Sequence, residues 1–451
     1  MSDEEPQETA LGEEGGPPVQ PDRRGWRELY ESEDWWAIWF ATLLLACIGL
    51  GLVSLVPTIG RWSTNPLEAL PGDLLLPLAL LCLGLALMTT IGVAIMKSPW
   101  RPYVAGFGCI FALACLSYLL AKQSTMRAWG IGYAIWALGL GLLISNTVRT
   151  PKWLLRAARS EMFIKTGLVL LGAEILFSRI LQLGPPGLMV AWIVTPTVIL
   201  FMWYFGTRWL KVRSKKLTII IAAATSVCGV SAAIATAAAC RAKKAELTLA
   251  VGMTMIFTVL MMIAMPALAR VIGLPPAVGG AWLGGTIDST GAVVAAGAFL
   301  GEDAERVAAV VKMIQNVLIG IVGFFVALAW VTRIERDPTA PRPSLMEIWH
   351  RFPKFIVGFV VASVVFSFIL MPVLGSDGVS EILNHSKVFR GWFFCLAFVA
   401  IGLESNFKDL GSQLVGGKAI ILYVVGQSFN ILLTLLVAWL AFGGVLFELS
   451  I

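Results

Sequence analysis

The chain has 451 residues, of which 58% are hydrophobic and only 14% are charged. A water-soluble protein with so few polar residues could not cover its surface, so that class is excluded. The formal charge of +6 does not indicate a nucleic-acid partner, because the Lys and Arg residues fall in short segments beside apolar blocks. We therefore expect a multi-pass protein of the cell inner or plasma membrane, with lipid around it.

Residues 1–34 open with MSDEEPQETALGEEGGPP, which is acidic and rich in Pro and Gly. The stretch has neither the basic n-region nor the apolar h-region of a signal peptide. Its composition is typical of chains that bury too little apolar surface to fold. We interpret residues 1–34 as a disordered acidic tail.

Thirteen apolar blocks follow, each close to the roughly 20 residues that a membrane-spanning helix needs. They are too long and too uniform for the strands of a barrel, so their backbone hydrogen bonds are expected to close within helices. The fold class predicted is therefore an all-α polytopic membrane protein. The blocks are 36–56, 74–95, 102–121, 129–147, 163–183, 187–209, 217–239, 247–269, 277–299, 307–332, 352–374, 388–404 and 418–447.

Most Lys and Arg residues lie on one side of this alternating arrangement, the side that also holds the N-terminus. The positive-inside rule makes that side cytoplasmic. One short loop dissents, because RAKK at 241–244 falls on the sparsely charged side.

The blocks divide into three N-terminal spans at 35–128 and two groups of five, at 129–273 and 277–447. A repeat with an odd number of spans reinserts upside down, which predicts inverted five-helix repeats with a site near the bilayer midplane. In both groups the fourth block is interrupted and polar. We expect two discontinuous helices there, broken near Gly229 and Gly402, that cross each other.

The first of these blocks contains TSVCGVSAAIATAAAC, residues 225–240, in which every side chain is small except those of Val and Ile. Small residues allow two helix breaks to approach closely, and the freed backbone groups would line a cavity. The alternative is ordinary contact between helices, which Gly, Ala, Ser and Thr also provide in membranes.

Ionisable residues at membrane depth are costly unless paired or wet, and this chain has four, at Glu174, Asp288, Lys312 and Glu404. For Asp288 and Lys312 the alternative to a transport role is a structural ion pair that ties two helices. A lysine beside the N-termini of broken helices would make a cavity attractive to anions.

Neither an enzyme nor a metal centre is indicated. The two histidines, His350 and His385, fall in loop-like sequence, the seven cysteines show no C-x-x-C spacing, and no nucleotide-binding motif lies between a strand and a helix.

At Cys228, Gly229, Ser231 and Ala232 the pattern C-G-x-S-A resembles that of the so-called sulfate exporter family, long catalogued as uncharacterised conserved membrane proteins. Further motifs follow that family's order over residues 129–447. They are GLLISNT at 141–147, KTGLVLLGAEI at 165–175, GGTIDSTGAVVAAG at 284–297, AAVVKMIQN at 308–316 and AIGLESNFKDLG at 400–411.

The resemblance extends to sodium/proton antiporter-like and bile-acid-transporter-like proteins. It implies inverted repeats, two crossing discontinuous helices and a scaffold domain that forms a homodimer. Departures weaken the inference to sulfate: Asp288 and Ser289 replace a His-Asp pair, and Gln315 stands where the family has Arg.

We expect a secondary active transporter of a small anion, such as sulfate, another sulfur oxyanion or an organic anion. It would have no cofactor, with H⁺ or Na⁺ as the coupling ion. One alternative is a cation/proton antiporter that uses Asp288 and Glu404. Another is a non-transporting membrane sensor or scaffold. The predicted substrate site comprises Thr225, Ser226, Cys228, Gly229, Ser231, Asp288, Ser289, Lys312, Gln315, Asn316, Gly402, Glu404 and Ser405.

Overall fold

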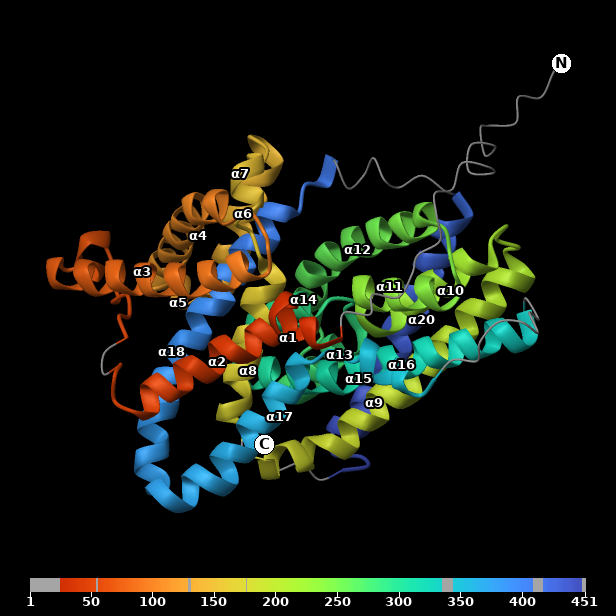
Figure 1. Ribbon diagram of the computed structural model, residues 1–451. Coiled ribbons are helices and arrows are strands. Elements are labelled where there is room, and N and C mark those ends of the chain that lie inside the picture. The colour runs from red at the N-terminus through yellow and green to blue at the C-terminus, as the bar shows by residue number, and fades with distance from the viewer. Residues whose placement is uncertain are drawn as a thin grey trace. The chain divides into compact units, whose positions relative to one another are not determined.

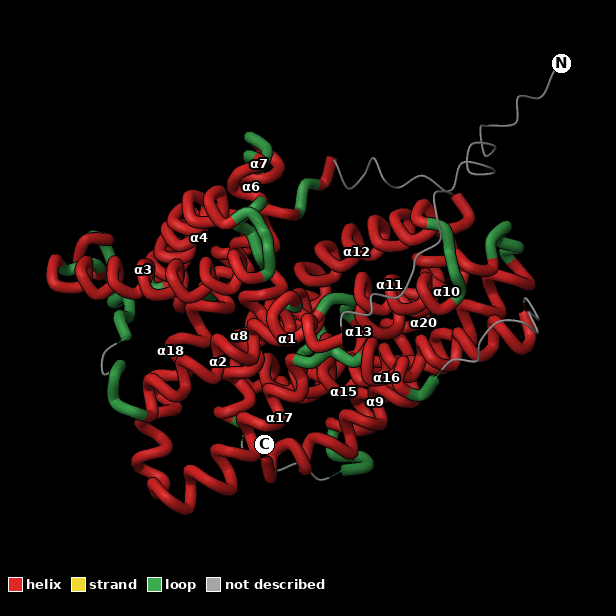
Figure 2. Tube along the Cα trace, in the orientation of Figure 1, coloured by secondary structure: helices red, strands yellow, loops and turns green. Residues whose placement is uncertain are grey.

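The computed structural model describes residues 25–53, 56–128, 131–175, 177–334, 344–408 and 417–447. Within these ranges the elements are helices joined by short loops, with no β-strand (Figures 1 and 2). The all-α fold class predicted from the sequence is confirmed. Residues 1–24 of the proposed N-terminal tail lie outside the described residues. Residues 25–34 belong to the helical turn Gly25–Arg27, to α1 (Glu28–Glu31) and to the start of the next helix, so the predicted disorder does not extend to them.

Eight helices of the described chain are long and apolar enough to cross a membrane. They cover Gly72–Ile95, Trp100–Ala121, Ile180–Trp209, Lys215–Ala239, Lys244–Val271, Glu302–Ile334, Phe355–Glu404 and Gly417–Phe442. Tyr133–Thr147 and Thr290–Leu300 are shorter apolar helices. The chain is thus a multi-pass membrane protein.

The chain folds into two compact units. One, which we call the bundle unit, comprises Arg24–Gln182 and Pro353–Asn406. The other, the hairpin unit, comprises the described residues within Leu183–Phe352 and from Phe407 to residue 447. Each unit takes residues from both of the predicted repeats, and the inverted relation between those repeats stays a prediction.

The bundle unit is built around α18 (Met371–Glu404), which packs on α6 (Tyr133–Thr147) and α8 (Ser160–Glu174). Also against α8 pack α2 (Glu33–Gly49) and α17 (Phe355–Val365). The hairpin of α3 (Gly72–Ile95) and α4 (Trp100–Ala121) adds the remaining long helices.

Small residues allow α18 and α6 to touch. A Cβ atom on Gly402 would lie 2.8 Å from the Cα of Gly141. Such close backbone approach is typical of helix pairs in membranes, where packing drives association. The helix ends at Glu404, two residues after Gly402, and Ser405 and Asn406 are not helical. The chain is therefore interrupted close to Gly402, while the crossing of this segment with the Gly229 turn stays a prediction. A second break lies within α18 at Gly375, where φ is 70°.

The hairpin unit contains four long helices: α9 (Phe177–Tyr204, most of which belongs to this unit), α12 (Lys244–Val271), α15 (Glu302–Ala329) and α20 (Gly417–Phe442). Four short helices lie among them: α10 (Lys215–Ala223), α11 (Gly229–Ala239), α13 (Pro276–Thr286) and α14 (Thr290–Leu300). How the short helices connect determines the candidate site.

Candidate functional site

The segment Lys215–Ala239 is interrupted at Cys228 and Gly229, as expected from its sequence. After α10 comes a π-helical turn, η5 (Ala224–Cys228), and Gly229 then has φ 29° and ψ −110°. Side-chain-bearing residues rarely adopt such a φ. A Cβ on Gly229 would also lie 2.9 Å from Thr254 Cγ2 and 3.2 Å from the carbonyl oxygen of Asp288. Glycine is therefore required at this turn for two separate reasons.

This segment folds back on itself rather than crossing as one broken rod. Lys216 Nζ donates to the carbonyl of Arg241 at 3.3 Å, and Ser214 hydrogen-bonds to Glu246. A straight helix from residue 215 to 239 would be about 37 Å long, far beyond the reach of those side chains. Helices α10 and α11 therefore form a helical hairpin, although the segment is long and apolar enough to span.

Helices α13 and α14 form a second helical hairpin. Cβ atoms on Gly280 and Gly297, at the open end of the pair, would each lie within 3.3 Å of backbone atoms of Ala304. The turn between the two helices is Ile287, Asp288 and Ser289. Within the hairpin unit, the segment that meets the Gly229 turn is thus 287–289. The predicted crossing with the break near Gly402 stays a prediction.

The two hairpins run along opposite halves of α15. Gly280 and Gly284 of α13 contact Ala304 and Ala308 near its start. Ala232 and Ala235 of α11 pack with Leu318 and Ile319, further along α15. The two turns therefore meet beside the middle of α15.

Lys312 occupies that midpoint and joins the two turns. Its Nζ donates to the carbonyl of Val227 at 2.5 Å, to that of Ile287 at 2.7 Å and to Gln315 Oε1 at 2.7 Å. The side chain is 1% exposed. These carbonyls end η5 and α13, where a helix concentrates partial negative charge. Lys312 thus neutralises the negative carbonyl end of the first helix in each hairpin, which is η5 after α10 in one and α13 in the other.

Amide side chains satisfy the neighbouring carbonyls of both turns. Gln315 Nε2 donates to Ser226 O and Gly285 O, both at 3.0 Å. From α20, Asn430 Nδ2 donates to Thr225 O at 3.2 Å and to Thr286 O at 3.4 Å. Three side chains thus each bridge one carbonyl of the first turn to one of the second.

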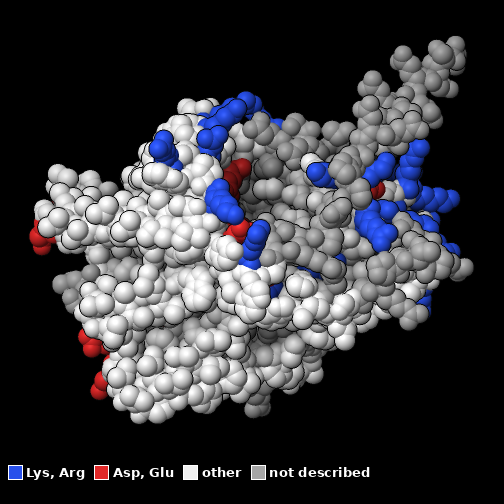
Figure 3. Space-filling view, in the orientation of Figure 1, with Lys and Arg blue, Asp and Glu red and all other residues white. Residues whose placement is uncertain are grey.

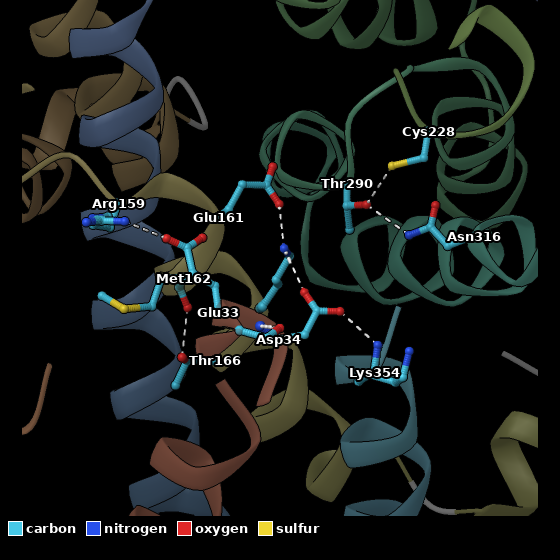
Figure 4. A network of polar contacts seen from close by, with 12 residues as sticks. Glu33, Asp34, Arg159, Glu161, Met162, Thr166, Cys228, Thr290, Asn316 and Lys354 are labelled. Carbon is cyan, nitrogen blue, oxygen red and sulfur yellow. Dashed lines mark hydrogen bonds and ion pairs between the residues drawn. The ribbon is translucent and has the colours of Figure 1, made fainter. Parts of the chain in front are cut away.

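The N-termini of α11 and α14, the second helices of the two hairpins, are not capped in a comparable way. Their N-caps, Cys228 and Ser289, make no side-chain capping hydrogen bond. Instead Cys228 Sγ lies 3.6 Å from Thr290 Oγ1, which accepts from Asn316 Nδ2 at 3.0 Å (Figure 4). Val230 and Ser231, in the first turn of α11, are exposed.

Asp288 belongs to the second turn, lies against the first, and is 1% exposed. Tyr423 OH donates to its Oδ2. Among the described residues no ion pair joins Asp288 to Lys312, so the structural tie considered from the sequence is absent there. Five buried oxygens of this region lack a hydrogen-bond partner within the described chain: Thr225 Oγ1, Thr286 Oγ1, Asp288 Oδ1, Asn316 Oδ1 and Gln427 Oε1.

Ten of the thirteen predicted site residues belong to this part of the hairpin unit. The other three, Gly402, Glu404 and Ser405, belong to the bundle unit. There Glu404 accepts from Ser160 Oγ at 2.7 Å, and the carbonyl of Ser405 accepts from Ser145 Oγ at 2.9 Å. Their described contacts are with α6 and α8.

The predicted site omitted the contributions of α20. Tyr423, Gln427 and Asn430 lie on one face of that helix and contact Asp288, Thr286 and both turns. A signal was present in the sequence, since Gln427 and Asn430 are polar residues three positions apart in an apolar span.

Basic residues gather at the open end of the first hairpin, where η4 (Phe205–Trp209) leads into α10 (Figure 3). Because α10 and α11 fold back, the basic loops 208–216 and 241–244 lie at the same end of the hairpin unit. The loop that disagreed with the expected orientation therefore joins the more basic side.

The family model described as conserved hypothetical protein 698 matches residues 105–423. A UPF0324 membrane protein of Rhodopirellula baltica, RB9488, is 53% identical over 85% of this chain and 71% of its own length. Another from Nitratidesulfovibrio vulgaris is 51% identical over 82% of this chain and 65% of its own length. A third from Nitrosomonas europaea, NE0724, is 27% identical over 92% and 96% of the two chains.

No solved structure matches the chain. The family match covers more than half of the residues and includes both hairpins. The chain belongs to the family of conserved hypothetical protein 698, the UPF0324 membrane proteins.

Proposed function

We propose that this protein is a secondary active transporter that moves a small anion by alternating access, with its substrate site at the two hairpin turns. The observation that carries the proposal is a difference between the helix ends at these turns, because side chains bind the C-terminal ends but do not cap the N-terminal ends. Lys312 binds the carbonyl ends of the first half-helices, whereas the N-termini of α11 and α14 have no side-chain cap.

The electrostatic consequence follows from the helix dipole. A helix N-terminus carries about half a positive charge, and its first N–H groups have no acceptor within the helix. With the opposing carbonyl ends neutralised by an ammonium group, the potential left at the turns is positive. An oxyanion can bind such N–H groups directly.

Access to this position supports a transported ligand rather than a packing role alone. Val230 and Ser231 in the first turn of α11 are exposed, while Lys312 and Asp288 behind them are buried. A solute would meet the N–H groups of α11 first. Sulfate or another sulfur oxyanion is the substrate class that the sequence resemblance favours, and the names of the relatives specify no substrate.

A cation/proton antiporter is the second candidate, and the unpartnered oxygens favour it. Asp288 Oδ1, Thr286 Oγ1 and Gln427 Oε1 could accept a proton or surround a hard cation such as Na⁺, which prefers oxygen ligands. The same oxygens would serve a coupling ion in an anion transporter. A sensor or scaffold role is favoured by no contact in the described chain.

The orientation proposed places the N-terminus and the basic loops 208–216 and 241–244 in the cytoplasm. A homodimer, the absence of enzymatic activity and residence in the inner or plasma membrane belong to the same proposal.

The test is transport by the purified full chain in proteoliposomes, with currents recorded on a solid-supported membrane for a panel of anions and cations. Ser231→Leu should abolish anion currents, because leucine would obstruct the open N-terminus of α11. Ile234→Leu, one turn further along the same exposed face, is the matched control and should retain them. Normal anion currents from folded Ser231→Leu, or currents evoked only by cations, would overturn the anion proposal.

A further inference from the structure

A second positively charged site lies in the bundle unit, away from the hairpin turns. The loop between α2 and α3 and the short helix α5 (Ser124–Ala128) border an open hollow of about 600 Å³. Arg61, Lys122 and Arg127 line it, and Glu68 is the acidic residue among the lining. The described residues give none of these four side chains an ion-pair partner.

The hollow is held in shape by hydrogen bonds across a long sequence separation. Trp62 Nε1 donates to the carbonyl of Leu119 at 2.7 Å, and the backbone of Trp62 pairs with that of Gln123 in a parallel β-bridge. Gly60 N donates to Ala69 O at 3.1 Å, which closes the loop. These hydrogen bonds therefore fix the position of the loop at the end of α4.

This pairing places the three cations together. Arg61 and Lys122 each precede one of the bridged residues, so they lie at equivalent positions on neighbouring segments. Arg127 follows one helical turn after Gln123, to whose carbonyl its N–H donates at 3.0 Å. Burial, and then the neighbouring charges of Arg127 and Arg61, lower the pKa of Lys122.

We propose that this hollow binds a phosphate- or sulfate-type dianion. Three cations against one carboxylate leave a charge that a dianion would balance, and two arginines can each offer paired N–H donors to its oxygens. A volume of about 600 Å³ exceeds a bare oxyanion and suits an anionic group carried on a larger molecule. The same chemistry is present in a phospholipid headgroup and in a water-soluble oxyanion.

The position of the hollow in the bundle unit is compatible with both a phospholipid headgroup and a water-soluble oxyanion as the ligand. The hollow begins where α4 ends, and Leu75 and Leu76 at the nearby start of α3 are 57% and 67% exposed, as lipid-facing side chains are. The loop itself, with Arg61 and Arg127 exposed, is open to water. The site does not depend on the transport proposal.

The experiment compares two triple variants of the full chain. Arg61→Gln/Lys122→Gln/Arg127→Gln empties the hollow of cations, whereas Arg101→Gln/Lys152→Gln/Arg156→Gln removes three exposed charges near the other end of α4. Binding of inorganic phosphate and sulfate is measured in neutral detergent. Binding of phosphatidylglycerol, with phosphatidylcholine as reference, is measured by native mass spectrometry.

We expect the hollow variant to bind the anionic probe at least about tenfold more weakly than the control variant. Inorganic oxyanion binding identifies a soluble ligand, and selective binding of phosphatidylglycerol identifies a lipid headgroup. Melting temperatures establish that both variants fold, and the single variant Arg127→Gln provides a milder change. Equal binding by the two triple variants, or no binding of any anionic probe to the unmodified chain, would overturn the proposal.

Discussion

Buried charges are neutralised differently in the two units of this protein. In the bundle unit they meet opposite charges: Arg390 lies 2.9 Å from Glu174, and Lys165 lies 2.9 Å from Asp34. Figure 4 shows how Asp34 also accepts from the backbone N–H of Lys354. In the hairpin unit Lys312 bonds to backbone carbonyls and to Gln315, and Asp288 bonds to Tyr423.

The difference separates architecture from a candidate binding function. A carboxylate paired with a cation has no charge left for a ligand, and the pair links two helices. Lys312 is paired with backbone carbonyls rather than with a carboxylate, and Asp288 retains one unpartnered oxygen. Four predictions test this comparison.

Breaking the pair in the bundle unit should have the largest effect on folding. Arg390→Gln leaves Glu174 buried without its cation, which should lower the free energy of unfolding by about 3–5 kcal/mol. The double variant with Glu174→Gln should recover much of that loss. Melting temperatures of the purified variants measure both effects. Transport by the folded fraction should be unchanged, and a transport defect in the double variant would contradict the purely structural role.

Lys312→Gln should affect transport more than folding. The neutral side chain no longer neutralises the carbonyls of Val227 and Ile287, so anion flux should fall at least about tenfold, while stability falls by about 1–3 kcal/mol. Lys312→Arg keeps the charge and should alter selectivity through its different donor geometry. Adding Asp288→Asn should not restore flux. Restoration by the double variant would show that the two residues behave like Glu174 and Arg390.

Asp288→Asn distinguishes the two transport proposals. For an anion bound at the N-termini, loss of a nearby negative charge should strengthen binding several-fold, although coupling to an H⁺ or Na⁺ gradient is lost. For a cation/proton antiporter the same change should abolish transport. Substrate titration of currents with and without an ion gradient separates these outcomes, and Asp303→Asn, an exposed change at the start of α15, is the control.

The smallest expected effect concerns pH at the hollow of the bundle unit. The pKa of Lys122 lies below its usual value of 10.5, while both arginines stay charged. As the pH rises through that lowered pKa, the hollow loses one of its three positive charges, so affinity for a dianion should fall. Lys122→Arg should remove this dependence. A binding isotherm that weakens equally with pH in the Lys122→Arg variant would assign the titration to the ligand or to another group.

The sequence predicted the helix interruption at the first hairpin but not that the two short helices on either side of it fold back against each other. Gly229 within a run of small residues indicated a helix interruption, because glycine and small neighbours permit what larger residues forbid. That α10 and α11 turn back is shown by the contacts of Ser214 with Glu246 and of Lys216 with Arg241. Hydropathy cannot distinguish a 25-residue span from two short helices side by side.

Composition and the length of the apolar blocks determined that the chain is an all-α membrane protein, because a backbone in lipid must be satisfied within helices or a closed barrel and these blocks are too long for barrel strands. The pattern of polar residues also selected Asp288, Lys312, Gln315 and Asn316 as members of one region. The tertiary structure decided which turns meet. It paired Gly229 with Asp288 in the hairpin unit, since the partner of a turn is fixed by the packing of α12, α15 and α20 around it.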